Sequence, residues 1–164
     1  MASPTQPPRN PTCCKRGPED GRPILCLPRL PGAPSVLVVK LAPGVECNVQ
    51  LPPRYTGLIL AVVDSWHADE GEVETLRGFR TAAELGKRYA EFSSAGVSIT
   101  EKAVRAYVYE IKVRIARAVS SLDPRKRMDI RVPGLLEAWR VLGYRIDRCG
   151  LEVVHPRPRE APEH

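Results

Sequence analysis

The sequence contains few residues of the kinds that build catalytic or metal centres. Only three histidines occur in its 164 residues, at positions 67, 155 and 164. Its five cysteines include no C-x-x-C or C-x-x-H pair, the spacing by which two ligands usually bind one zinc ion. We find no Ser/His/Asp set that would activate a nucleophile and no glycine-rich loop that would bind phosphate. We therefore expect no enzyme, no metal site and no other cofactor.

Long apolar runs are also missing. No stretch approaches the roughly 20 apolar residues of a membrane-spanning helix, and the first residues lack the apolar run of a signal peptide. A cytoplasmic protein that does not enter the membrane is therefore expected. The odd number of cysteines then favours reduced thiols.

Proline, in contrast, is abundant and unevenly placed. Nine of the 17 prolines lie in the first 34 residues, a segment with few β-branched or aromatic side chains and no apolar period. This composition predicts a disordered or loosely packed arm over residues 1–34. The remainder predicts one domain over residues 35–154 and a flexible tail over residues 155–164.

The net charge of +6 is concentrated in one third of the chain. Residues 98–148 contain 12 basic and 6 acidic residues, whereas the rest of the chain is balanced. Such local asymmetry suggests a polyanionic partner. A solvated face in an arginine-rich protein is the alternative interpretation.

The first half of the domain predicts two strands and two helices. Residues 35–41 and 45–51 are β-branched or alternate in polarity around an Ala-Pro-Gly turn, which is typical of a hairpin. A pair of prolines then marks a helix entry, and the apolar residues within 58–63 fall on one side of that helix. Thr81 and Glu84 have the spacing of a capping box at the start of a second helix.

Residues 64–74, between these two helices, are acidic. A loop or a frayed helix end fits this composition. Carboxylates beside His67 suggest acid–base or metal chemistry only weakly, because acidic loops are usually solvated and no second histidine is near. This acidic run, residues 64–74, is instead a candidate contact for another protein.

The most regular segment is 98–122. Ser98 and Glu101 repeat the capping-box spacing. Behind them, apolar residues recur every three or four positions, which predicts a long amphipathic helix that Pro124 ends. The apolar residues are Val104, Val108, Ile111, Ile115, Val119 and Leu122, and the opposite side displays Lys102, Arg105, Ala106, Tyr109 and Lys112.

A strand-like pair around Leu142 and Gly143 follows, with Arg140 near its turn. A capped helix, a short turn, a longer helix with a basic face and then a hairpin is the order of a winged helix-turn-helix. Such a helix places its N-terminal dipole end and first-turn side chains near phosphates and base edges.

The residue types on the long helix suit this use. The Arg105 guanidinium can make a bidentate contact with a guanine, and Ala106 would allow close approach. Tyr109 could stack or pack on a thymine methyl group. Thr100 and Lys102 are candidates for phosphate contacts. A solvated helix surface is the alternative.

Two motifs carry a resemblance to a known family. The run KAVRAYVYEIKVRI (102–115) resembles the recognition helix of the winged-helix effector domain of OmpR/PhoB-type response regulators, and LEAWRVLGYRI (136–146) is similar to its wing. Residues 51–63 more loosely resemble the entry to its first helix. The resemblance implies an α+β fold, a winged helix-turn-helix with a small N-terminal antiparallel sheet, three helices and a C-terminal β-hairpin wing.

The same resemblance implies sequence-specific binding of double-stranded DNA by a stand-alone transcriptional regulator. Recognition helix 98–122 would enter the major groove and wing 135–154 the minor groove, where an arginine suits the negative potential. A homodimer on DNA is a candidate assembly, and RNA polymerase or another protein is a candidate partner of the acidic run 64–74. A winged-helix protein-interaction module without DNA binding is the alternative. The expected DNA-binding residues are Thr100, Lys102, Arg105, Ala106, Tyr109, Lys112, Arg125, Lys126, Arg127, Arg131, Arg140 and Arg145.

The chain departs from the family pattern in several places. The proline-rich arm stands where a receiver domain would precede the winged helix, so control by phosphorylation is not expected. The connection before the wing is longer than in the family. It places Arg125, Lys126, Arg127 and Arg131 near the DNA side. Val141 follows Arg140 where the family often has glycine.

Overall fold

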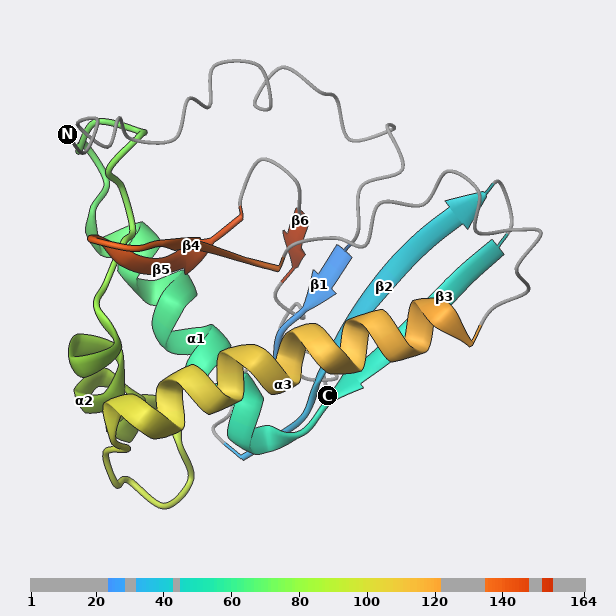
Figure 1. Ribbon diagram of the computed structural model, residues 1–164, viewed down its shortest axis with the longest axis horizontal. Helices are drawn as coiled ribbons and strands as arrows, with labels where there is room; N and C mark the ends of the chain where they lie inside the picture. Colours follow the sequence, from blue (N-terminus) through green and yellow to red (C-terminus); the bar gives the residue numbers. More distant parts are fainter. Residues whose placement is uncertain (1–23, 29–31, 43–44, 122–134, 148–151, 155–164) are drawn as a thin grey trace, which may run out of the picture.

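Alternating apolar residues form the strands at the start of the domain. In the computed structural model, β2 (Ser35–Ala42) and β3 (Val45–Leu51) pair antiparallel with Leu37 opposite Val49, which confirms the predicted hairpin. The structure describes residues 24–28, 32–42, 45–121, 135–147 and 152–154. Within these ranges it is an α+β fold of three helices, a four-stranded sheet and a two-stranded hairpin (Figure 1).

The resemblance predicts an antiparallel sheet, but the sheet is mixed. β1 (Ile24–Cys26) pairs antiparallel with β2 and parallel with β6 (Glu152–Val154), so the strand order is β3-β2-β1-β6. Glu152–Val154 therefore belongs to this sheet, and its assignment to the wing is wrong. The prediction of a disordered or loosely packed arm is also wrong for residues 24–28, because Leu25 and Leu27 are buried in the core.

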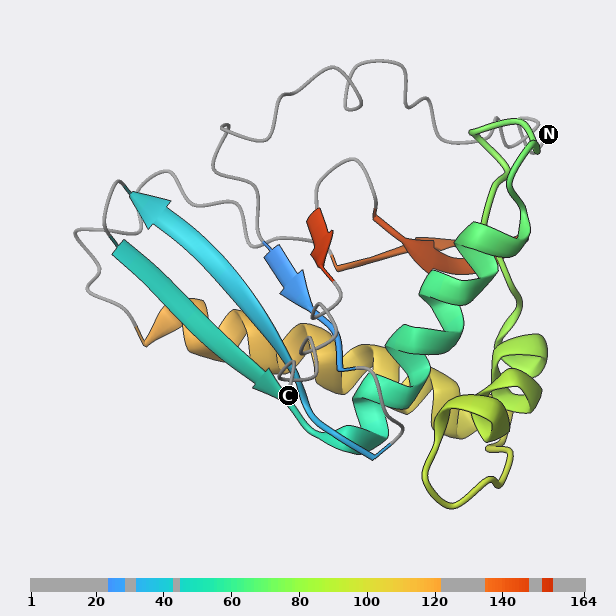
Figure 2. The same cartoon turned by 180° about the vertical axis from the view of Figure 1, so that it is seen from behind.

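Helix α1 (Pro53–Ala68) lies in the centre of the molecule. Pro53 occupies its first turn, as predicted, where a missing N–H is not needed. Buried residues occur along most of its length, from Tyr55 to Trp66, because the helix contacts α2, α3 and β5 (Figures 1 and 2). It also includes the first part of the acidic run, so residues 64–68 are helical.

The two later helices begin with different caps. α2 (Ala82–Phe92) has the predicted capping box between Thr81 and Glu84. α3 (Glu101–Ser120) is capped by Thr100, whose hydroxyl accepts the N–H of Ala103 at 3.1 Å, so the expected Ser98–Glu101 box is wrong. The predicted apolar stripe is confirmed from Val104 to Val119, whereas Leu122 lies outside the described residues.

The predicted terminal hairpin consists of β4 (Leu136–Trp139) and β5 (Gly143–Ile146). Figure 2 shows it beside α1, which β5 contacts. Tyr144 and Arg80 exchange backbone hydrogen bonds of 2.8 and 3.0 Å, which fix the hairpin to the segment before α2. Gly143 has a φ of +99°, and a Cβ there would lie 2.0 Å from the Arg80 carbonyl oxygen, so this position requires glycine.

No helix within the described ranges is both long enough and apolar enough to cross a bilayer.

Candidate nucleic-acid interface

One side of α3 is exposed and basic. Its side chains recur at intervals of three or four residues and so share one face of the helix, opposite the buried stripe. Tyr109 is 65% exposed, although an aromatic ring of this size is usually covered. We call this surface the basic face of α3, and it consists of Lys102, Arg105, Ala106, Tyr109 and Lys112.

Thr100 lies at the N-terminal end of this face. Because its oxygen accepts the Ala103 N–H, the hydroxyl is fixed in place as the cap of the helix. The hydroxyl proton can still be donated to an acceptor outside the chain. The position is thus compatible with the expected phosphate contact.

Arg105 forms an ion pair with Glu101, one turn earlier, at 3.2 Å. The two side chains are 61% and 53% exposed. Exposed pairs of this kind contribute little stability because water screens them. Arg105 can therefore exchange Glu101 for an external acceptor at small cost.

A cleft of about 590 Å³ lies between the start of α2, the basic face of α3 and the hairpin. Arg105 contributes to one wall, and Arg140, at the exposed hairpin turn, contributes to the other. Trp139 also lines the cleft and is only partly buried. The fold thus brings together two arginines that are far apart in the sequence. The remaining lining residues are Thr81, Ala82, Ala138, Val141, Gly143 and Tyr144.

Arg145 does not belong to this surface, and the prediction that it contacts DNA is wrong. The residue is 1% exposed, and its Nε donates to the carboxylate of Glu137. Its Nη1 donates to three backbone carbonyls, those of Glu74 at 2.9 Å, Thr75 at 3.2 Å and Arg77 at 3.3 Å. The physical reason is the alternation of side chains along a strand, which turns Arg145 away from the face that Tyr144 occupies.

Two aromatic rings enclose the same guanidinium. The Arg145 Cζ lies 4.4 Å from the ring centre of Phe79 and 5.7 Å from that of Trp66. A cation over an aromatic face is attracted by the negative potential of the ring. Arg145 therefore joins the hairpin to α1 and to the loop that follows it.

No protein-family model, curated protein or solved structure matches the chain. In the part of the chain that the structure describes, no group of three His, Cys, Asp or Glu side chains is placed to hold a metal ion. The chemistry of the exposed surfaces is therefore the basis for assigning a function.

The acidic run is partly neutralised by ion pairs. Asp64 pairs with Arg88, and Asp69 forms two hydrogen bonds of 2.7 Å with Arg80. The Arg80 hydrogen bond holds the pKa of the Asp69 carboxyl below its ordinary value of 3.8, and Asp69 raises the pKa of Arg80. Glu70 and Glu72 remain exposed, and a protein contact through this run stays a prediction.

Four of the expected DNA-binding residues, Arg125, Lys126, Arg127 and Arg131, lie outside the described residues. The sequence predicts correctly that Lys102, Arg105, Ala106, Tyr109 and Lys112 share the exposed side of α3, because helical periodicity decides it. It missed the cleft, since no local pattern relates the hairpin turn to Arg105. It also missed the Asp69–Arg80 pair, for which the sequence gives no spacing signal.

Proposed function

We propose that the chain is a winged helix-turn-helix protein that binds double-stranded DNA in a sequence-specific manner and regulates transcription. α2 and α3 form the helix-turn-helix, and the β4–β5 hairpin forms the wing. The observation that carries the proposal is the shared cleft, because Arg105 on α3 and Arg140 at the hairpin turn line it together. One duplex can then contact the helix and the wing at the same time.

The basic face of α3 has the chemistry for the major groove. The Arg105 fork matches the O6 and N7 acceptors of guanine, and Ala106 leaves room for the helix to approach. Tyr109 offers an exposed ring to a thymine methyl group or to the backbone sugars. Thr100, Lys102 and Lys112 lie at the ends of this face and would contact phosphates, which position the protein without specifying a sequence.

Arg140 has the chemistry for the adjacent minor groove. It is exposed at the turn of a hairpin whose backbone is fixed beside that turn by the hydrogen bonds between Tyr144 and Arg80, so little backbone entropy is lost when it binds. The negative potential of a narrow minor groove attracts an arginine side chain.

The proposal is tested by selecting duplexes from a random library and measuring their affinity by fluorescence anisotropy. Affinity should fall between about 50 and 200 mM salt, by about 0.9 log units per log unit of salt for each phosphate neutralised. Arg105→Ala should weaken the selected duplex by about 1–3 kcal/mol and an unrelated duplex much less.

Lys87→Ala is the matched control, since it removes one exposed positive charge from α2 outside the basic face and the cleft. This variant should keep the sequence preference. Absence of binding at low salt, or equal loss of preference in both variants, would contradict the proposal.

A protein-interaction module is the second candidate. It is favoured by Val73 and Leu76, which are exposed beside Glu70 and Glu72 in the loop after α1. Exposed apolar side chains within a polar rim are typical of a contact surface. Affinity capture that recovers a protein and no nucleic acid would favour this function over DNA binding.

A further inference from the structure

The second half of α3 and strand β3 form a different surface. Within the described residues, β3 is the last strand of the sheet and pairs only with β2. Its other edge carries main-chain N–H and C=O groups that no neighbouring strand of this sheet satisfies. Such an edge is a template on which a further strand can form.

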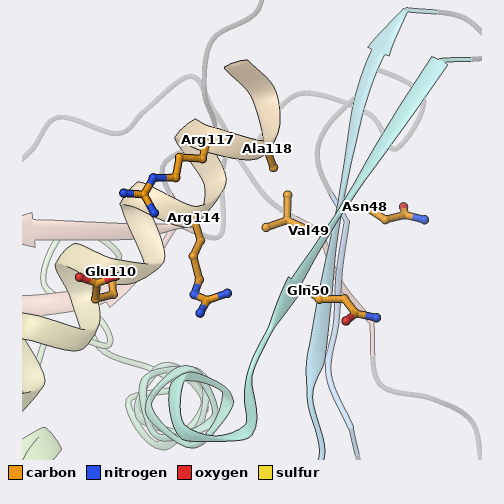
Figure 3. Close-up of a pocket in the computed structure, with 7 residues that line it drawn as sticks. All are labelled: Asn48, Val49, Gln50, Glu110, Arg114, Arg117 and Ala118. Carbon is orange, nitrogen blue, oxygen red and sulfur yellow. The ribbon is translucent and has the colours of Figure 1, made fainter. Parts of the chain in front are cut away.

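A groove of about 330 Å³ runs beside this edge. Figure 3 shows that Val49 points toward α3, whereas Asn48 and Gln50 point to the other side of the strand. Side chains of α3 therefore form the opposite wall of the groove. The residues that line it are Asn48, Val49, Gln50, Glu110, Arg114, Arg117 and Ala118.

The charges of this groove favour an anionic occupant. Two arginines and one carboxylate line it, and Arg117 is exposed. Arg114 extends from α3 into the space between the helix and the sheet (Figure 3). Its Cζ lies 5.4 Å from the ring centre of Tyr55. Its Nε is buried and has no hydrogen-bond partner. A buried donor without a partner is costly, so an acceptor supplied by an occupant would be stabilising.

We propose that this groove binds an acidic, extended segment of a partner protein, which adds to the sheet as a strand beside β3. Main-chain hydrogen bonds to the edge would supply affinity. Arg114 and Arg117 would select carboxylates through charge-assisted hydrogen bonds. A second copy of this chain is a poorer occupant, because the same edge would bring the same two arginines toward each other.

This proposal does not depend on DNA binding. The basic face of α3 uses residues from Lys102 to Lys112, whereas the arginines of the groove lie in the following turns of the helix. One helix would thus carry two contacts, with DNA near its start and a protein strand near its end.

The test uses the full chain labelled with ¹⁵N and a synthetic peptide that alternates valine and glutamate, with the seven-residue length of β3. Titration should shift the amide signals of residues 45–51 and of the last turns of α3. Arg114→Glu and Arg117→Glu should each weaken binding by about tenfold or more, because an attractive charge becomes repulsive. Arg114→Gln, which keeps most of the side chain, should weaken it less.

Lys87→Glu is the control, since it makes the same change of charge on α2, and it should bind the peptide as the wild type does. A peptide with lysine in place of glutamate should bind at least about tenfold more weakly. Urea unfolding of each variant checks that it is folded. Three outcomes would overturn the proposal: no shifts at millimolar peptide, shifts confined to other elements, or equal binding of the two peptides. Sedimentation that shows a dimer of the free chain, together with no binding of the peptide, would also overturn it, in favour of a second copy.

Discussion

Arg145 and Glu137 face each other across the β4–β5 hairpin, and the Nε of Arg145 donates to the carboxylate of Glu137. The side chain of Arg145 is 2% exposed and that of Glu137 is 29% exposed, so the charge of the arginine is held inside the fold. Its remaining hydrogen bonds reach the loop after α1. One buried cation thus fixes the hairpin whose turn carries Arg140.

Replacing Arg145 should destabilise the protein strongly. Arg145→Met removes the partner of Glu137 and leaves the carbonyls of residues 74, 75 and 77 without this donor, which should cost about 3–5 kcal/mol of unfolding free energy. Urea denaturation measures the loss. Arg140→Ala, at the exposed turn, should remain within about 0.5 kcal/mol of the wild type. Equal stability of the two variants would show that the buried hydrogen bonds contribute little.

Gly143→Ala should displace the hairpin from the segment before α2. The new Cβ would overlap the Arg80 carbonyl, and alanine is strained at this positive φ. A loss of about 2 kcal/mol or more is expected. Hydrogen exchange of the Arg80 and Tyr144 amides should become faster, because these two groups hold the bridge. Unchanged exchange would mean that the contact is not maintained in solution.

The Asp69–Arg80 pair should make stability depend on pH in the acid range. The folded state lowers the pKa of Asp69 below its ordinary value of 3.8, so the unfolded chain takes up a proton first as the pH falls. The contribution of the pair is therefore present above about pH 4 and is lost as the pH falls through the lower, folded-state pKa.

Chemical denaturation of the wild type and of Asp69→Asn measures this contribution. Their difference in unfolding free energy should be constant from neutral pH to about pH 5 and should shrink below pH 3.8. Glu72→Gln serves as the control at an exposed carboxylate. A difference that persists unchanged at pH 3 would rule out the ion pair as its source.

Lysines on the basic face of α3 should contribute to DNA affinity equally for all DNA sequences. Lys102→Ala and Lys112→Ala should weaken the selected and unrelated duplexes alike, because a phosphate contact carries no base information. Each should reduce the slope of log affinity against log salt by about 0.9. Anisotropy titrations at several salt concentrations give both quantities. A selective loss for one duplex would instead place the lysine at a base edge.

The contribution of Arg140 to DNA affinity should depend on the width of the minor groove. Arg140→Ala should cost more affinity on duplexes with an A-tract beside the α3 contact than on duplexes with G·C pairs there, since an A-tract narrows that groove. Paired titrations on the two duplexes measure the difference. Equal losses on both would indicate an ordinary phosphate contact.

Local patterns made much of the fold predictable. The stripe from Val104 to Val119 determines which side of α3 is buried, and the Thr81–Glu84 box determines where α2 begins. Both depend on residues a few positions apart. The sequence does not decide the cap of α3, since Ser98 and Thr100 are both suitable cap residues and the structure uses Thr100.

Long-range contacts were not accessible from the sequence. Ile24–Cys26 and Glu152–Val154 are each too short to show a period. Ile24–Cys26 becomes a strand between β2 and Glu152–Val154, and Glu152–Val154 becomes one by pairing with Ile24–Cys26. Arg140 and Arg145 are similar basic residues of one motif, yet one is exposed at the turn and the other is buried.

The sequence by itself determined the amphipathic helix, the terminal hairpin and the basic character of the α3 surface, because periodicity and charge are local properties. Only the tertiary structure decided that Arg145 is a buried connection, that Asp69 pairs with Arg80, and that Arg105 and Arg140 share one cleft. These relations depend on how α1, α3 and the hairpin pack, and packing brings together residues whose separation along the chain carries no signal.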